Sequence, residues 1–126
     1  KCYQLEHLNL QGNRIGNQAA IDIAKGSKNH PTLTSLNLGH NRIGNKGAAA
    51  LIDLVGSIPT LREIDLSWNF IADKGARVIL EVLNANRSAV EADSLIIKLH
   101  GNFHISDEMI RKMQKVFPGT FKLQLV

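Results

Sequence analysis

Residues 33–44 read LTSLNLGHNRIG, and this stretch decides the fold because the chain repeats it. The same pattern stands as LEHLNLQGNRIG at residues 5–16 and as LREIDLSWNFIA at residues 61–72, so that successive copies are 28 residues apart. A fixed period of this size indicates a solenoid, in which each unit buries its apolar face against its neighbours. Proteins of this kind work mainly through their surfaces.

Each unit contains two successive hydrophobic periods. Leu36 and Leu38 alternate with polar residues, which predicts a strand with one buried face. Beyond the asparagine the spacing becomes helical, because Ala48, Leu51 and Ile52 fall on one stripe of a helix. The residues that we expect to act as N-caps, by accepting hydrogen bonds from the first helical turn, are Asn17, Asn45 and Asp73.

Glycines in the first turn of two predicted helices indicate tight packing there. Gly47 and Gly75 occupy equivalent positions, where glycine lowers the helix propensity. We therefore expect a close approach of backbone at these two positions.

A strand, a turn, a helix and a return segment within 28 residues place successive strands side by side and parallel. The helices must then form a second layer. Because helices are wider than strands, we expect the stack to curve into a horseshoe with the sheet on its concave side. The predicted fold class is α/β.

The repeat continues less regularly towards the C-terminus. Leu66 and Leu99 are 33 residues apart, so five extra residues have entered between them. We assign these to an insertion loop over residues 84–94, and we interpret residues 95–126 as irregular repeats of one domain that spans residues 1–126. Ser106 is predicted to cap a helix, and residues 121–126 to form a fifth strand. Since the chain does not begin with Met, we expect a fragment of a longer array.

The pattern Leu-x-x-Leu-x-Leu-x-x-Asn-x-Ile-Gly resembles the leucine-rich repeat. The period and the helix start GNKGA at residues 44–48 resemble the ribonuclease-inhibitor-like subfamily, whose relatives include Nod-like receptor, Ran GTPase-activating and tropomodulin repeat domains. This resemblance implies a right-handed β-α superhelix with about five parallel strands on the concave face and about four helices on the convex face. It also implies a scaffold that binds a protein partner through the concave sheet. A Ran-type regulatory GTPase activator and a structural element of a large complex stay open as alternatives.

Composition restricts the setting of this chain. The 126 residues are 44% hydrophobic and 21% charged, which is ordinary for one soluble domain, and no apolar run approaches the length of a membrane span. Cys2 is the only cysteine, which excludes an internal disulfide and favours a reducing compartment. We therefore expect a cytoplasmic, or at least intracellular, protein.

An asparagine follows each of the first four predicted strands. Where the chain turns from strand to helix, buried backbone groups need hydrogen-bond partners. We interpret these asparagines as a structural ladder that supplies such partners. Its members are Asn13, Asn41, Asn69 and Asn102.

The side chains that alternate with the buried ones on each strand point to the concave face. They vary from unit to unit, as recognition of an irregular partner requires. Trp68 is the only tryptophan and stands in the adjoining turn, and tryptophan is frequent among residues that dominate binding energies. The predicted partner-binding residues are His7, Asn9, Gln11, Asn37, His40, Glu63, Asp65, Trp68, Lys98, His100 and Lys122.

Other classes of function have little support. The five histidines fall in different units without a nucleophile or a close pair of metal ligands, so we predict no enzyme activity, no metal and no cofactor. Arg14 and Arg42 occupy equivalent positions, but Phe70 and Phe103 follow them in the next units. A phosphate track is therefore not sustained, and nucleic acid is disfavoured as a partner. The sequence indicates neither the identity of the protein partner nor the oligomeric state.

Overall fold

The computed structural model describes residues 4–92 and 94–122, in which strands and helices alternate along the chain. The first part contains β1 (His7–Asn9), α1 (Asn17–Ser27), β2 (Ser35–Asn37), α2 (Asn45–Ile52) and the 3-10 helix η1 (Asp53–Gly56). The second part contains β3 (Glu63–Asp65), α3 (Asp73–Ala85), α4 (Arg87–Ala92), β4 (Ile96–Lys98), α5 (Asp107–Val116) and β5 (Phe121–Lys122).

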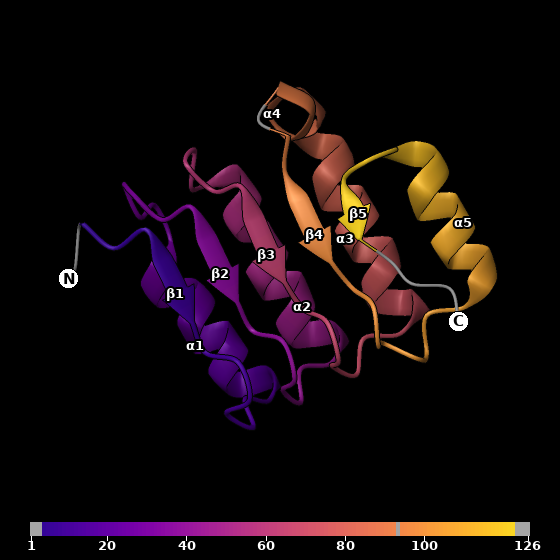
Figure 1. The fold of residues 1–126 in the computed structure, drawn as a ribbon, viewed down its shortest axis with the longest axis horizontal. Coiled ribbons are helices and arrows are strands. Elements are labelled where there is room, and N and C mark those ends of the chain that lie inside the picture. Colours follow the sequence, from indigo (N-terminus) through magenta and orange to yellow (C-terminus); the bar gives the residue numbers. More distant parts are fainter. Residues whose placement is uncertain (1–3, 93, 123–126) are drawn as a thin grey trace.

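The described strands form one parallel sheet, in which their spatial order is their order in the sequence. Equivalent residues of successive repeats lie opposite one another, so that Leu36 pairs with Leu8 on one side and with Ile64 on the other. Helices α1, α2, α3 and α5 lie side by side behind the sheet (Figure 1). We call the side of the sheet that is turned away from these helices the concave face. The predicted α/β solenoid is confirmed.

The core lies between the sheet and the helices. Leu38 and Leu66 from the sheet layer are fully buried, as are Leu51 and Ile79 from the helix layer. Burial of one such side chain stabilises the fold by about 1.5–3 kcal/mol, so this layer is the main source of stability. Leu8 is only partly buried, because β1 packs against a single neighbouring strand.

The prediction that Asn17, Asn45 and Asp73 are N-caps is wrong. Each is the first residue of its helix, and the preceding glycine or alanine makes no side-chain cap. The three side chains reach the next repeat instead. Asn45 Oδ1 accepts hydrogen bonds from the backbone N–H groups of Ala72 (2.9 Å) and Gly75 (3.0 Å) at the start of α3. We call this arrangement the cross-repeat cap.

Two further cross-repeat caps occur, the first with the same geometry and the second with a hydroxyl as its other donor. Asn17 Oδ1 accepts from the N–H groups of Gly44 (2.8 Å) and Gly47 (2.9 Å). Asp73 accepts from the backbone N–H of Ser106 (2.7 Å) and from its hydroxyl (2.8 Å). These two bonds from Ser106 hold the pKa of Asp73 below its ordinary value, and the nearby charge of Arg77 acts in the same direction.

Other atoms do approach Gly47 and Gly75 closely, but the expectation that backbone makes this approach is wrong. A Cβ atom at Gly75 would collide with Asn45 Oδ1, and one at Gly47 would lie 2.8 Å from Asn17 Oδ1. The approaching atoms belong to side chains and not to backbone: the cap asparagine of the preceding repeat and the isoleucine that stands just before the helix. Glycine is needed here because the cap occupies the space of a Cβ atom.

The prediction of a loop over residues 84–94 is wrong, because this segment contains the end of α3 and the whole of α4. Val90 is buried and provides α4 with an apolar contact to the core. The guanidinium carbon of Arg87 lies 4.3 Å from the ring centroid of Phe117, and Arg87 also pairs with Glu91 at 3.6 Å. The segment that contains the five extra residues is therefore largely helical and packs against the core.

The end of the chain follows the sequence pattern as far as the structure describes it. Ser106 is the N-cap of α5, as predicted, and its hydroxyl accepts a hydrogen bond from the N–H of Met109 at 3.2 Å. Strand β5 begins at Phe121, while residues 123–126 of the predicted strand lie outside the described residues. None of the helices in the described ranges has the length and hydropathy that crossing a membrane requires.

Candidate protein-binding surface

The parallel register sorts the predicted partner-binding residues into rows across the concave face. One row consists of Asn9, Asn37, Asp65, Lys98 and Lys122. A second row consists of His7, Ser35, Glu63 and Ile96. Neighbouring members are one strand apart, about 4.8 Å, so that one partner can contact several repeats at once.

Part of the first row also stabilises the strand exits. Asn37 Oδ1 accepts a hydrogen bond from the N–H of Gly39 (3.0 Å). Asn9 Oδ1 accepts one from the N–H of Gln11 in the same way. Asp65 Oδ1 accepts from both the N–H (2.9 Å) and the hydroxyl (2.6 Å) of Ser67. The second carboxylate oxygen of Asp65 takes no part in these bonds, which leaves acidic character on the surface.

Hydrogen bonds between neighbouring strands orient the first two repeats of this face. The hydroxyl of Ser35 lies 2.7 Å from Nδ1 of His7. Asn37 Nδ2 donates to Gln11 Oε1 at 3.0 Å. Contacts within the chain therefore orient the predicted binding residues His7, Asn9, Gln11 and Asn37 in the absence of a partner.

The middle of the face carries opposite charges. Lys98 Nζ lies 3.7 Å from Glu63 Oε1, and both side chains are more than one third exposed. A surface pair of this kind contributes at most about 1 kcal/mol to stability. Together with Asp65, the pair presents an acidic centre that is bordered by one cation.

Three of the four ladder asparagines, Asn41, Asn69 and Asn102, are buried and join adjacent repeats. Asn41 Nδ2 donates to the carbonyls of Leu38 (3.0 Å) and Leu10 (3.1 Å). Its Oδ1 accepts from the N–H groups of Asn13 and Ile15, both at 2.9 Å. One amide thus satisfies backbone groups of two repeats.

The ladder continues through Asn69 and Asn102, whose Oδ1 atoms accept from the N–H groups of Ile43 (2.9 Å) and Ile71 (3.0 Å). Both amides are buried. Asn13 at the other end is exposed, and among the described residues its amide donates to two carbonyls of its own repeat. These contacts favour a structural role over a binding role for the ladder.

The residue before each ladder asparagine has a left-handed backbone. These residues are Gly12 (φ 72°), His40 (φ 53°), Trp68 (φ 56°) and Gly101 (φ 80°). Glycine adopts this conformation without strain, whereas a bulky side chain disfavours it. The turn therefore holds His40 and Trp68 in a costly conformation at the rim of the concave face.

Trp68 connects three repeats at this rim. Its ring stacks on His40 with centroids 5.6 Å apart, and it meets the edge of Phe103 at 5.3 Å. Gly101 leaves room for the indole, because a Cβ atom there would collide with the ring. Phe103 was not predicted as a binding residue. Phe103 has the same position in its repeat as Phe70, and its repeat follows that of Trp68. This equivalence was the signal that could have revealed it.

The remaining predicted residues are spread over the sheet. His100 is half-buried, and its carbonyl accepts a hydrogen bond from the N–H of Trp68 at 2.8 Å. His7 and Lys122 lie on the two outer strands of the described sheet, so no small ligand can contact both. The arrangement therefore suits a large partner.

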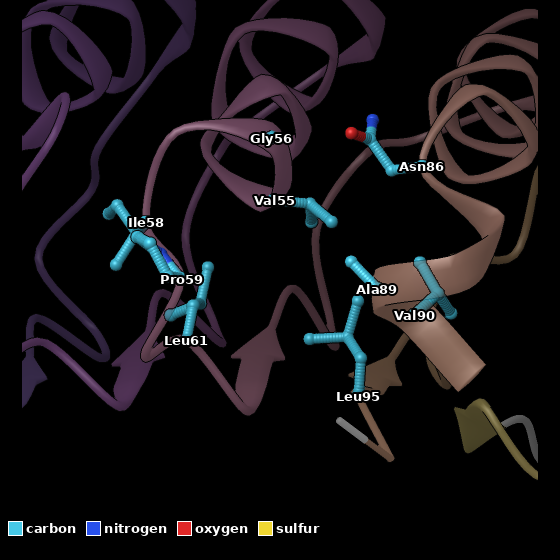
Figure 2. Close-up of a pocket in the computed structure, with 9 residues that line it drawn as sticks. All are labelled: Val55, Gly56, Ile58, Pro59, Leu61, Asn86, Ala89, Val90 and Leu95. Atoms are coloured by element: carbon cyan, nitrogen blue, oxygen red, sulfur yellow. The ribbon is translucent and has the colours of Figure 1, made fainter. Parts of the chain in front are cut away.

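The described residues contain no group of three His, Cys, Asp or Glu side chains that could hold a metal ion. They do form a cleft of about 240 Å³ between the segment that follows α2 and helix α4 (Figure 2). Its lining is mainly aliphatic, and its amide residue, Asn86, donates to the carbonyl of Val82 at 2.9 Å. None of the described residues that line this cleft has a titratable side chain.

The sequence profile of the leucine-rich repeat family matches residues 4–24, 29–51 and 57–80, which is more than half of the chain. The chain belongs to the leucine-rich repeat family. Its repeats are of the ribonuclease-inhibitor-like type, as the period and the helix starts predicted. Comparison with curated protein sequences gave no match.

Solved structures of two proteins are similar to this leucine-rich repeat chain. One is actin-binding site 2 of leiomodin-1, with a TM-score of 0.80 and 15% identity over 98% of this chain and 73% of that one. The other is the tropomodulin C-terminal domain of Caenorhabditis elegans, with a TM-score of 0.77 and 14% identity over 99% of this chain and 77% of that one. At these identities the similarity shows a shared fold.

Proposed function

We propose that this leucine-rich repeat chain is a protein-interaction module whose concave face binds a protein partner. The observation that carries the proposal is the row in which Asn37, Asp65 and Lys98 stand at equivalent positions of successive repeats. A repeated frame with different side chains at these positions can match an irregular protein surface. The name of the similar leiomodin-1 domain describes an actin-binding site, which supports a protein as the class of partner.

Trp68 is the proposed anchor of this interface. Its exposed fraction is 42%, and its stacking on His40 keeps the ring in place before binding. Large aromatic side chains held in this way dominate the energy of many interfaces. Glu63 and Asp65 would meet basic side chains of the partner, and such complementarity mainly raises the association rate and the specificity.

An affinity pull-down with mass spectrometry tests the proposal. The bait is the wild-type chain or a double variant that combines Trp68→Ala with Asp65→Lys. The matched control is Glu81→Lys, which makes the same charge change at an exposed position of α3. We expect a discrete partner that the double variant loses and the control keeps. Equal recovery by all three baits contradicts concave-face binding.

Actin is a second candidate partner, because 98% of this chain matches the fold of 73% of a domain whose name describes actin binding. Cosedimentation with filamentous actin, and gel filtration with monomeric actin, test this candidate directly. Binding that the double variant loses supports it. If the chain binds neither form, actin is excluded as a partner. Binding of another protein to the concave face is then tested by the pull-down alone.

We infer that the chain is not an enzyme, which contrasts with the alternative of a Ran-type GTPase activator. Such an activator would need a particular asparagine or arginine against the nucleotide, and no sequence motif singles one out. Several polar groups of the concave face bond one another instead. GTP hydrolysis by candidate small GTPases should therefore be unchanged when the chain is added. An acceleration would contradict this inference. Binding only through the helices and the end repeats would instead favour a structural element of a large complex.

A further inference from the structure

A second surface lies beside the concave face, at the edge where the strands end. The residues directly after the ladder asparagines are all exposed and form a column across four repeats, namely Arg14, Arg42, Phe70 and Phe103. His40 and Trp68 border this column, since the ring of Trp68 contacts Phe103. We call these six residues the edge strip.

The edge strip exposes aromatic residues of a kind that the chain buries elsewhere. Phe70 and Phe103 are 60% and 75% exposed, whereas Phe117 and Phe121 are 2% and 6% exposed. The chain has four phenylalanines, so half of them stand at equivalent surface positions. A contiguous apolar patch with a polar rim is typical of an interaction site.

The backbone of the edge strip indicates function independently of exposure. Gly12 and Gly101 show that glycine satisfies the turn, yet His40 and Trp68 adopt the same left-handed conformation. Strain of this kind persists where surrounding contacts enforce it, and it concentrates at binding and catalytic sites. Here it fixes the indole ring over Gly101 and against Phe103.

The opposite end of the edge strip is cationic. Arg14 and Arg42 are exposed, and neither forms an ion pair within the described ranges of the chain. A carboxylate could therefore bind either guanidinium without displacing a partner, and bidentate pairing with arginine is geometrically favoured. The strip thus combines two unpaired cations with an aromatic platform.

The dimensions of the edge strip suit a short extended segment. Four members at one strand spacing each span about 14 Å, which about five residues of extended chain can cover. Arginines beside aromatic rings also suit single-stranded nucleic acid. However, a phosphate track needs many cations in line, and the two arginines of the strip are too few for one.

We propose that the edge strip binds an extended acidic segment of a protein partner, with carboxylates on Arg14 and Arg42 and one large apolar side chain against Trp68 and Phe103. This proposal rests on the proposed function, because it names the chemistry of a partner segment and places it at the rim of the concave face. It does not require the rows of the sheet to contact the same segment.

Selection of peptides tests the proposal without knowledge of the partner. Random eight-residue peptides displayed on phage are selected on the complete wild-type chain, on Phe103→Ser, and on a chain that combines Arg14→Glu with Arg42→Glu. Because the substituted side chains are exposed, unchanged circular dichroism should accompany each variant. We expect the wild-type chain to enrich peptides with two acidic residues and a Phe, Trp or Leu within about five positions.

The variants should change this selection in different ways. Phe103→Ser should bind the enriched peptides at least about tenfold more weakly, which corresponds to about 1.4 kcal/mol. The double glutamate variant should select basic peptides in their place. Absence of an acidic and apolar pattern, or equal binding by Phe103→Ser, overturns the proposal.

Two further arms separate the other interpretations. The Asp65→Lys chain should bind the same peptides. If it loses them while Phe103→Ser still binds them, the peptides bind the concave face, and the proposal for the edge strip is wrong. A fluorescent twelve-nucleotide single-stranded DNA is titrated against the wild type and Phe103→Ser. Binding of this DNA that depends on Phe103 and displaces the peptides would assign the strip to nucleic acid and overturn the peptide proposal.

Discussion

The Oδ1 atom of Asn45 accepts a hydrogen bond from the backbone N–H of Gly75, which lies 3.0 Å away in the next repeat. A Cβ atom at residue 75 would collide with that oxygen. The asparagine and the glycine are therefore one device, in which a side chain of one helix caps the start of the following helix. Asn17 and Gly47 form the same pair one repeat earlier.

Gly75→Ala should destabilise the protein by about 1–3 kcal/mol, because the new methyl group displaces Asn45 from the helix start. This loss should outweigh the advantage of alanine in a helix, which is about 1 kcal/mol. Gly26→Ala in α1 is the matched control, since no atom outside the helix's own backbone and the adjoining residues lies within 4 Å of its added Cβ. Urea denaturation should show the control to be as stable as the wild type or more so. Equal changes in the free energy of unfolding for the two substitutions would show that the methyl group at residue 75 does not displace Asn45.

Asn69→Ala should be among the most damaging single changes in the chain. It removes the acceptor of the buried Ile43 N–H. It also removes one of the two amide donors to each of the carbonyls of Leu38 and Leu66, which keep their bonds from the neighbouring ladder asparagines. Each buried group left unpaired costs about 1–3 kcal/mol. Asn13→Ala, at an exposed ladder position, should cost less than about 1.5 kcal/mol. Thermal denaturation of the two variants measures the difference, and similar melting temperatures would contradict the cross-repeat role of Asn69.

The stability that Asp73 contributes should depend on pH. Folding lowers the pKa of Asp73, so its ionised form stabilises the folded state. The contribution is complete above the unfolded pKa, about 4, and is lost as the pH falls through the lower folded pKa. Asp73→Asn can still accept from the Ser106 N–H, as Asn45 does from Ala72, but it cannot titrate.

Urea midpoints of the wild type and Asp73→Asn, measured from neutral pH to about pH 2, test this dependence. The wild type should be the more stable at neutral pH, and the difference should shrink as the carboxylate becomes protonated. A difference that stays constant over this range would show that the charge of Asp73 contributes nothing.

Gly101→Ala should displace the indole of Trp68. The added Cβ atom would collide with the ring, and alanine also disfavours the φ of 80° at this position. Gly12→Ala has the same backbone cost at φ 72° but meets nothing within 4 Å, so it isolates the effect of the collision. Since Trp68 is the only tryptophan, its fluorescence should shift in Gly101→Ala and not in Gly12→Ala. An unchanged spectrum in both variants would contradict the packing of Trp68 on Gly101.

The repeated part of the fold could be predicted from the sequence because its causes are local. Alternation around Leu36 and helical spacing after Asn41 are set by which side chains must be buried, and three copies agree. The parallel register followed from the period. The cross-repeat caps could not be recognised, because Asn45 at a helix start has the same local preference whether it caps its own helix or the next one.

The irregular part was harder to predict because its contacts are remote in sequence. Helix α4 looks like a polar loop, but Val90 reaches the core and Arg87 packs on Phe117, thirty residues further along. In the sequence, Phe103 indicated only that the arginines at positions 14 and 42 do not continue into the later repeats. Its contact with Trp68 depends on how two turns from different repeats meet, which no single repeat encodes.

The caps and the ladder connect neighbouring repeats in opposite directions. Asn45 accepts from the repeat that follows it, whereas Asn41 accepts from the repeat that precedes it. A DNA segment encoding any 28 consecutive residues of the regular part would carry one full set of both connections. Tandem copying of such a segment could lengthen the array and leave no buried amide unpaired at the new junction. The extra residues before β4 lie in the return segment, and the bond from Ile71 to Asn102 bridges the longer repeat unchanged. Growth by whole units is therefore an easier evolutionary step for this molecule than replacement of one ladder asparagine.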